Sequence, residues 1–302
     1  MSEEQNPIIL QKKGEECLKT SCCKSKPDYF KAIILFRDAS ELYHGEKKWR
    51  QEISCRYKLA NCFKQTKSFW EEGKEYEKIS KIRINQLNSS NDEVMIDINN
   101  AFQSFCAEKE YNSALKSVFD LSTQFMQKGN YVYAEKCSKI GFDNLNKFYH
   151  VIILKKNKES IDYLYDGIRQ YIDILIYNEE LNSAKKVIDN ILELIKSEDS
   201  DNKEEISKFN IFKLGIFILE DDKVNFEKLS NTCEQNKDLK SINQLKNAIY
   251  NCDDKEFKDA MIDIDYIFPN SMIKRINQLF KNIKNDNKEK KIEPEDVELD
   301  FK

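Results

Sequence analysis

Few residues in this chain are of the types that do acid–base, nucleophilic or metal chemistry. Its 302 residues include only two histidines, His44 and His150, which lie far apart in the sequence. A histidine needs a nearby partner to act as a catalytic base or to hold a metal. Seven scattered glycines cannot form the glycine-rich loop that cradles a phosphate. The sequence therefore predicts a protein that is not an enzyme and that uses no cofactor, metal or small-molecule substrate.

The nine cysteines show no chemical pattern either. Cys22 and Cys23 are adjacent, the others are single, and no spacing matches a zinc site. Most of them fall where a helix would accept a small apolar side chain. We therefore interpret them as reduced thiols of a cytosolic protein.

The elements that must position any site are helices, and the clearest of them follows Pro27. Apolar side chains recur there at steps of three and four residues, which places them on one stripe of an α-helix. Aromatic and small residues alternate, so a neighbouring helix can approach between the rings. Pro27 suits the first turn because its missing N–H is not needed there. The stripe consists of Tyr29, Ala32, Phe36, Ala39 and Tyr43.

The same stripe returns along the chain. Its starts near residues 29, 49, 69, 111 and 131 fall at multiples of about twenty residues, one helix and a turn. A weaker copy at Phe69, Tyr76 and Ile79 has Glu72 in place of the small residue. The fuller copies are Tyr111, Ala114, Val118, Leu121 and Phe125; Tyr131, Ala134, Ser138, Gly141 and Leu145; and Leu181, Ala184, Ile188, Ile191 and Ile195. The pattern predicts helical hairpins stacked in a degenerate repeat.

Composition favours helices throughout. The chain has 7 glycines and 4 prolines, far below the usual shares of about 7% and 5%, and no proline between Pro27 and Pro269. We therefore predict an all-α protein, a right-handed α-α superhelix of helical hairpins with a C-terminal helical bundle. The expected helices of the array cover residues 6–20, 27 onward, 49–63, 67–84, 92–108, 111–128, 130–148, 157–177 and 179–197.

Three regions are expected. Residues 1–199 form the helical array, which ends at the polar connection 197–202. Beyond it, the stretch that contains Phe209 and Phe217 is apolar on several sides, as is typical of a buried helix. We therefore predict a helical bundle over residues 200–285 and an acidic flexible tail over residues 286–302.

The charge pattern excludes some partners. The formal net charge of -4 argues against nucleic-acid binding, although lysines cluster locally, as at Lys155, Lys156 and Lys158. The first residues lack the basic and apolar segments of a secretory signal. The longest apolar run is far shorter than the roughly 18 residues of a membrane span. We expect a cytoplasmic protein.

The chain resembles the soluble NSF-attachment proteins (SNAPs), nearest the gamma type. The resemblance covers nearly the whole chain and is strongest from Cys17 to Trp49. Alanine positions of the family are often larger or polar here. The segments that carry it, in chain order, are Leu18-Lys19-Thr20, Lys26-Pro27-Asp28-Tyr29, Lys48-Trp49, Gly129-Asn130-Tyr131, Ser207-Lys208-Phe209, the last helix from Met272 to Ile283, and the end Asp300-Phe301-Lys302.

The resemblance implies a fold and a function. The fold is a tetratricopeptide-like twisted sheet of antiparallel helix pairs. The function is that of an adaptor that binds SNARE complexes, such as a syntaxin-type bundle, and recruits and stimulates the hexameric AAA ATPase NSF. NSF then disassembles the bundle by hydrolysing ATP, in vesicle fusion and intracellular protein transport, including ER–Golgi transport. Such an adaptor has no active site and associates peripherally with membranes.

The resemblance also implies where NSF binds. An apolar side chain at the tip of an acidic tail fits a pocket on a basic partner, and the carboxylates steer it there. Phe301 is then the anchor and Leu299 a second contact, with steering charges on Asp296, Glu298 and Asp300. The alternative is a tail that only aids solubility.

Two further groups of contact residues follow from the resemblance. The basic residues expected to face the SNARE bundle are Lys136, Lys139 and Arg169, although each could simply be solvated. The loop between the first two helices is expected to face the membrane through Cys22, Cys23, Lys24 and Lys26. Adjacent cysteines beside lysines are candidates for S-acylation, and the alternative is an exposed loop with inert thiols.

A second function remains open, that of an unrelated tetratricopeptide-type scaffold that binds extended peptides. The tail would then be dispensable, so deletion of Leu299 to Lys302 separates the two functions. An enzyme within the C-terminal bundle is a more distant alternative, and a ligand-sized pocket with perturbed carboxylates would favour it.

Overall fold

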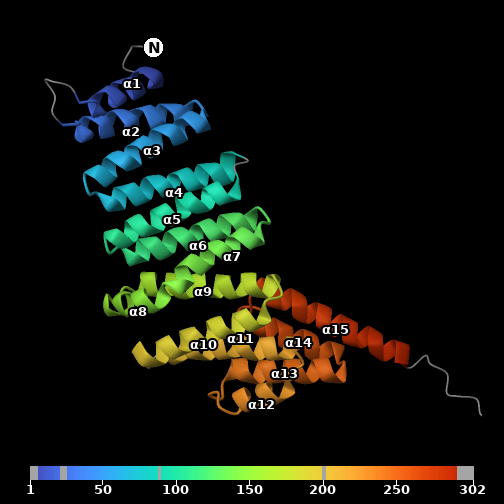
Figure 1. Cartoon of the computed structure of the whole chain (residues 1–302). Helices are drawn as coiled ribbons and strands as arrows, with labels where there is room; N and C mark the ends of the chain where they lie inside the picture. The colour runs from blue at the N-terminus through green and yellow to red at the C-terminus, as the bar shows by residue number, and fades with distance from the viewer. Residues whose placement is uncertain (1–5, 21–25, 88–89, 199–201, 291–302) are drawn as a thin grey trace, which may run out of the picture. The chain divides into compact units, whose positions relative to one another are not determined.

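The computed structural model describes residues 6–20, 26–87, 90–198 and 202–290, which are almost entirely helical (Figure 1). No strand occurs within these ranges. The predicted all-α fold is therefore confirmed. The helices are α1 (Pro7–Leu18), α2 (Tyr29–Gly45), α3 (Trp49–Gln65), α4 (Phe69–Gln86), α5 (Asn91–Ala107), α6 (Tyr111–Gln127), α7 (Tyr131–Asp143), α8 (Leu145–Leu154), α9 (Lys158–Tyr177), α10 (Leu181–Glu198), α11 (Lys203–Leu219), α12 (Lys223–Ser230), α13 (Lys237–Asn251), α14 (Asp254–Ile264) and α15 (Asn270–Lys290).

The chain divides into two compact units, the first ending at Ile168 and the second starting at Arg169. This division falls inside α9, earlier than the boundary at residue 199 that the sequence suggested. Both halves of α9 carry buried apolar side chains, such as Leu164 in the first unit and Ile172 in the second. The helix is continuous across this division, so no polar connection marks the boundary between the two units.

The aromatic and small stripe forms the core of the repeat helices. In α2, four of its members are buried and Tyr29 is half-buried. The stripes of α6 and α10 are buried in the same way. Five helices, α2, α3, α4, α6 and α7, begin at an aromatic residue where the repeat predicted a start. The three-and-four spacing therefore gave both the buried face and the helix starts.

The turns between these helices share a backbone conformation that usually requires glycine. Lys47, Lys67, Lys109 and Glu179 have φ between 56° and 67°, and Gly129 has φ 72°. In each turn the next N–H bonds back to a carbonyl of the last helical turn, as from Lys48 to Tyr43 at 2.9 Å. This is the Schellman arrangement that closes the C-terminus of a helix. Charged residues take the place of glycine in most of these turns.

Two helix boundaries differ from the sequence prediction. A single helix was expected over residues 130–148, but Asn144 separates α7 from α8. The Asn144 side chain donates to the Ile140 carbonyl at 2.9 Å, and such local bonding favours a helix end over a helix interior. Pro27 lies before the N-cap and not in the first turn of α2, because Asp28 accepts the Lys31 N–H and starts the helix.

The C-terminal helix is also longer than expected. α15 continues to Lys290, past residue 285, where the bundle was expected to end. Asn285, Asp286 and Asn287 are weak helix formers, but no glycine or proline interrupts residues 285–290, and the next residues, Lys288, Glu289 and Lys290, are good helix formers.

Within the first unit, α1 to α7 stack in chain order, and alternate helices form two rows (Figure 1). Short turns make successive helices antiparallel, so the members of one row run parallel. The first row is α1, α3, α5 and α7, and the second is α2, α4, α6 and α9. Side-chain pairs fix the register within the rows: Lys58–Glu15, Tyr57–Asp97 and Tyr133–Asp92 in the first, Asn85–Gln124 and Asn112–Ser160 in the second.

The second unit is built around α11, which contacts α10, α12, α13 and α15. Its side chains are buried nearly all round, from Phe209 to Ile218. A β-carbon at Gly215 would lie 2.5 Å from Met272, so glycine allows α15 to pack this closely. The Ser271 N–H at the start of α15 donates to Asp173 at 2.8 Å. A compact helical bundle is what the apolar sequence of α11 predicted.

Candidate functional site

Most of the predicted contact residues lie outside the described residues. These are the whole NSF-binding group (Asp296, Glu298, Leu299, Asp300 and Phe301) and the loop residues Cys22, Cys23 and Lys24. The remaining loop residue, Lys26, is exposed just before α2. The NSF contact and the membrane loop therefore stay predictions.

The two lysines predicted to face a SNARE bundle lie on α7. Lys136 and Lys139 are both exposed and three residues apart, so they are neighbours on one face of the helix. The Lys136 ammonium lies 4.3 Å from the centre of the Tyr133 ring, which favours the cation over the ring face. Neither lysine forms an ion pair with the described residues, and both charges are available to a partner.

The surface around these lysines also carries exposed apolar side chains. Val132 of α7 is 59% exposed and lies one turn before Lys136. Ile96 of α5, the neighbour of α7 in the first row, is 61% exposed. The Tyr133 hydroxyl donates to Asp92 at 2.8 Å and ties the two helices together here. We name Ile96, Val132, Lys136 and Lys139 the α5–α7 surface. It combines cations with apolar contacts, as an interface for an acidic amphipathic partner requires.

The third predicted SNARE contact, Arg169, is in a different situation. It belongs to the second unit, and its guanidinium donates to the buried Glu205 at 2.6 Å. A carboxylate this close compensates most of the positive charge. Arg169 is thus engaged within its own unit, and its role toward a partner stays a prediction.

A pocket of about 250 Å³ lies in the second unit, lined in part by Arg169 and Asp173. Burial raises the pKa of Asp173, although the carboxylate accepts the Ser271 N–H. A raised carboxyl pKa in a pocket is a feature of some active sites. Here, however, the carboxylate caps α15, Arg169 is bound to Glu205, and none of the described residues that line the pocket is a cysteine or histidine. The arrangement is that of a structural cap.

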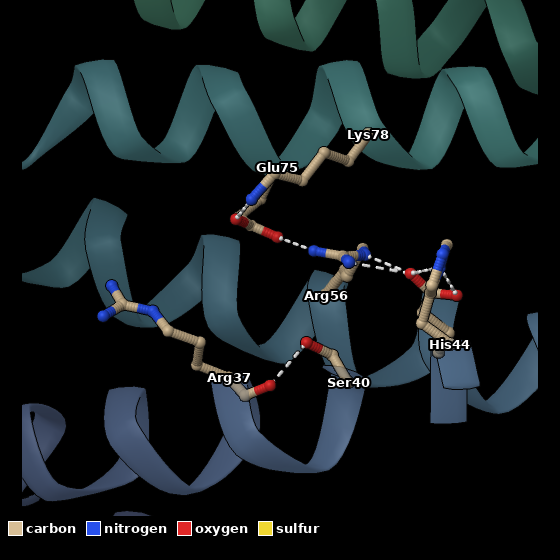
Figure 2. Close-up of polar contacts among 7 residues, drawn as sticks. Arg37, Ser40, His44, Arg56, Glu75 and Lys78 are labelled. Carbon is tan, nitrogen blue, oxygen red and sulfur yellow. Dashed lines mark hydrogen bonds and ion pairs between the residues drawn. The ribbon is translucent and has the colours of Figure 1, made fainter. Parts of the chain in front are cut away.

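A buried ion cluster lies between α3 and α4 (Figure 2). The Arg56 guanidinium bridges two carboxylates, 2.7 Å from Glu52 and 2.7 Å from Glu75. Lys78 pairs with Glu75 at 2.7 Å, and the His44 ring nitrogen lies 3.1 Å from Glu52. Buried charges are tolerated when they are paired and hydrogen-bonded in this way. One of the two histidines is thus part of a structural cluster.

Further carboxylates are buried in the first row. The Asp97 carboxylate accepts from the Tyr57 hydroxyl at 2.5 Å and lies 2.9 Å from Arg83. Burial raises the pKa of Asp97, and these two partners partly counter it. Burial and the Asp97 carboxylate raise the pKa of Tyr57 to about 12, so its hydroxyl stays protonated and donates. This group joins α3, α4 and α5.

The cysteines of the described residues are free, and several are buried. Burial raises the pKa of Cys55, Cys62 and Cys106 to about 11, which keeps these thiols protonated and unreactive. Among the described residues, no group of three His, Cys, Asp or Glu side chains is placed to hold a metal ion. In the same residues, no helix has the length and apolarity needed to cross a bilayer.

Comparison with known proteins does not assign the chain to a family. No family model and no curated protein matches the chain. The resemblance pointed to Lys136 and Lys139 but not to Ile96 or Val132, which the structure adds to the α5–α7 surface. The sequence could have indicated the exposure of Val132, because this residue lies beside the buried stripe of its helix and not on it.

Proposed function

We propose that this protein is a SNAP-like adaptor that binds a SNARE bundle and recruits NSF to disassemble it. The α5–α7 surface carries the proposal, because two free lysines beside exposed Val132 and Ile96 match an acidic helical bundle with apolar positions. The helical array supports it too, since an array of hairpins offers a long surface to a long partner. In this proposal the protein contributes binding and positioning, and ATP hydrolysis belongs to NSF.

The remaining contacts follow from the resemblance. The acidic tail steers Phe301 into an apolar pocket of NSF. The loop with Cys22 and Cys23 associates with the membrane, through the neighbouring lysines or through S-acylation. The protein then works in the cytoplasm, peripherally at membranes, in vesicle-mediated protein transport.

The charge-reversal variant Lys136→Glu/Lys139→Glu tests the surface directly. NSF and a fluorescent SNARE bundle are mixed with the wild-type protein or the variant, and ATP-dependent loss of the bundle is followed. We expect the variant to lose most of the stimulation, because its α7 repels the acidic bundle. Lowering the salt concentration should not restore the stimulation, since it strengthens this repulsion. Lys12→Glu/Lys13→Glu, a pair of exposed lysines on α1, is the matched control and should stay active.

Full activity of the α7 variant would move the SNARE contact away from the α5–α7 surface. Absence of stimulation by the wild-type protein would argue against the adaptor function and for the unrelated peptide scaffold.

A further inference from the structure

The second row of the first unit carries a pocket that the adaptor function does not use. It has a volume of about 200 Å³ and lies between α6 and the start of α9. Its floor is apolar, made of Leu115, Ile152 and Leu164, and these three side chains are buried. The α5–α7 surface belongs to the first row, so the two features lie on different rows of helices.

The walls of this pocket are held in place on both sides. At one end, Asn112 donates to the Ser160 hydroxyl at 3.2 Å and joins α6 to α9. Along the side, the Tyr163 hydroxyl donates to Asp120, and this bond fixes the ring that lines the pocket. The Lys116 ammonium lies 5.3 Å from the centre of that ring, at the rim. A pocket with fixed walls needs little reorganisation to accept a ligand.

The size of the pocket decides what can enter it. Pockets for small molecules and cofactors usually measure about 300–1,000 Å³, and this one is smaller. One aliphatic side chain fits, whereas a whole drug-sized ligand does not. The apolar floor and the polar rim of Asn112, Ser160 and Lys116 suit a side chain that enters from a peptide lying across the rim.

The charge beside the pocket indicates what kind of peptide binds. Lys155, Lys156 and Lys158 form the turn that leads directly into Glu159 and Ser160 of the pocket lining. All three lysines are exposed, and none forms an ion pair with the described residues. Lys156 has φ 49°, so the chain reverses sharply and the three side chains share a tight turn.

Acidic side chains also lie near the pocket. Glu159 lines it, Asp120 accepts from Tyr163, and Asp166 is close enough to act on that hydroxyl. The α5–α6 turn next to Asn112 carries Glu108 and Glu110 on either side of Lys109. The exposed lysines of the α8–α9 turn, with Lys116 across the pocket, form the positive part of its surroundings. Exposed Leu154, just before that turn, extends the apolar area. Such a combination is complementary to an acidic peptide with an aliphatic side chain.

We propose that the pocket between α6 and α9 binds one aliphatic side chain of an acidic peptide segment of a partner protein, with the lysines of the α8–α9 turn holding the flanking carboxylates. This gives the array a second binding surface. It goes beyond the adaptor function, because the recognition does not depend on whether the partner is a SNARE or belongs to another class of protein.

Fluorescence anisotropy with two labelled peptides tests this proposal. The first is a polyglutamate peptide with a single central leucine, and the second has serine at that position. Because the pocket removes the leucine side chain from water, the wild-type protein should bind the leucine peptide about ten-fold or more tightly than the serine peptide. Equal binding of the two peptides, or binding of neither, would overturn the proposal while leaving the disassembly assay unaffected.

Variants locate the binding. Ser113→Phe fills the pocket from α6 and should remove the preference for leucine, whereas Gln103→Phe at an exposed site of α5 should keep it. Lys155→Gln/Lys158→Gln alters only exposed side chains. It should weaken the binding of both peptides and make that binding less dependent on salt concentration. An unchanged preference in Ser113→Phe, or an unchanged affinity in the folded lysine variant, would contradict the assignment of the site.

Discussion

Gly167 of α9 lies directly against the ring of Phe119 of α6. A β-carbon built at Gly167 would be 2.3 Å from the ring, much closer than side chains can approach. Phe119 is fully buried, so its ring has little room to move. The same relationship recurs at Gly14 with Phe36 and at Gly73 with Phe105. Glycines inside helices, which cost helix stability, are thus used to let two helices close over an aromatic ring.

Gly167→Ala is therefore expected to destabilise the protein. Alanine favours the helix by about 1 kcal/mol, but overpacking a core costs about 1–3 kcal/mol, and here the neighbour cannot yield. We expect a net loss of up to about 2 kcal/mol in the free energy of unfolding, measured by urea denaturation. The control is Gly45→Ala, where nothing lies within 4 Å of the new β-carbon and no loss is expected.

A double-mutant cycle isolates this contact. Phe119→Leu makes space for the new methyl group, so Gly167→Ala should cost less in that background than in the wild type. Equal costs in the two backgrounds would show that the Gly167–Phe119 approach is not the cause.

Two substitutions in the turns with positive φ should change the stability of the protein in opposite directions. Gly129→Ala should lower the free energy of unfolding by about 1 kcal/mol, because φ 72° is unfavourable for a residue with a β-carbon although the space is open. Lys109→Gly should raise it by about 0.5 kcal/mol, since it removes the same strain at φ 62°. Thermal or urea unfolding checks both, and a stabilised Gly129→Ala variant would contradict the account of these turns.

Removal of Arg56 should be severe. Arg56→Met leaves Glu52 and Glu75 buried with only their outer partners, and breaking a buried charge pair costs about 3–5 kcal/mol. Lys78→Met removes a half-exposed partner of Glu75 and should cost less than about 1 kcal/mol. Comparable losses in the two variants, measured by urea denaturation, would mean that the cluster is not organised around Arg56.

Glu77 provides a pH-dependent test. Burial acts to raise the pKa of this carboxyl, but Lys81 at 2.5 Å and Lys74 at 3.0 Å outweigh it and lower the pKa below 4.5. A folded-state pKa below the unfolded value means that the stabilisation is present above that unfolded value and is lost as the pH falls through the folded pKa. Glu77→Gln should therefore destabilise the protein at pH 7, and its difference in the free energy of unfolding from the wild type should shrink below pH 4.5. A difference that stays constant with pH would contradict this.

The sequence was sufficient for the parts of the fold that depend on local pattern. The stripe from Tyr29 to Tyr43 predicted both a helix and its buried face, because helical periodicity and hydrophobic burial act on the same residues. The same pattern did not predict the helix end at Asn144. There, a hydrogen bond from the side-chain amide to the Ile140 carbonyl accompanies the end of a helix within an apolar pattern. A local hydrogen bond of this kind leaves no trace in the spacing.

The polar interior could not be predicted. Glu72 was recognised as an exception to the stripe, but nothing adjacent to Glu52 or Asp97 in the sequence indicates that they are buried. The partner of Asp97, Tyr57, lies on another helix, and only the stacking of the first row brings the two together. The same holds for the candidate site. The family resemblance pointed to the lysines of α7, whereas the apolar side chains beside them were recognised only from their exposure in the structure.

ATP-dependent disassembly of a SNARE bundle by NSF is the most direct test of our proposal that this protein couples NSF to the bundle. We expect the wild-type chain to stimulate disassembly and Phe301→Ala to abolish the stimulation, with binding of the bundle unchanged. Unchanged activity of Phe301→Ala would move the NSF contact away from the tail. No stimulation by the wild-type chain, over repeated trials with different SNARE bundles, would contradict the adaptor function.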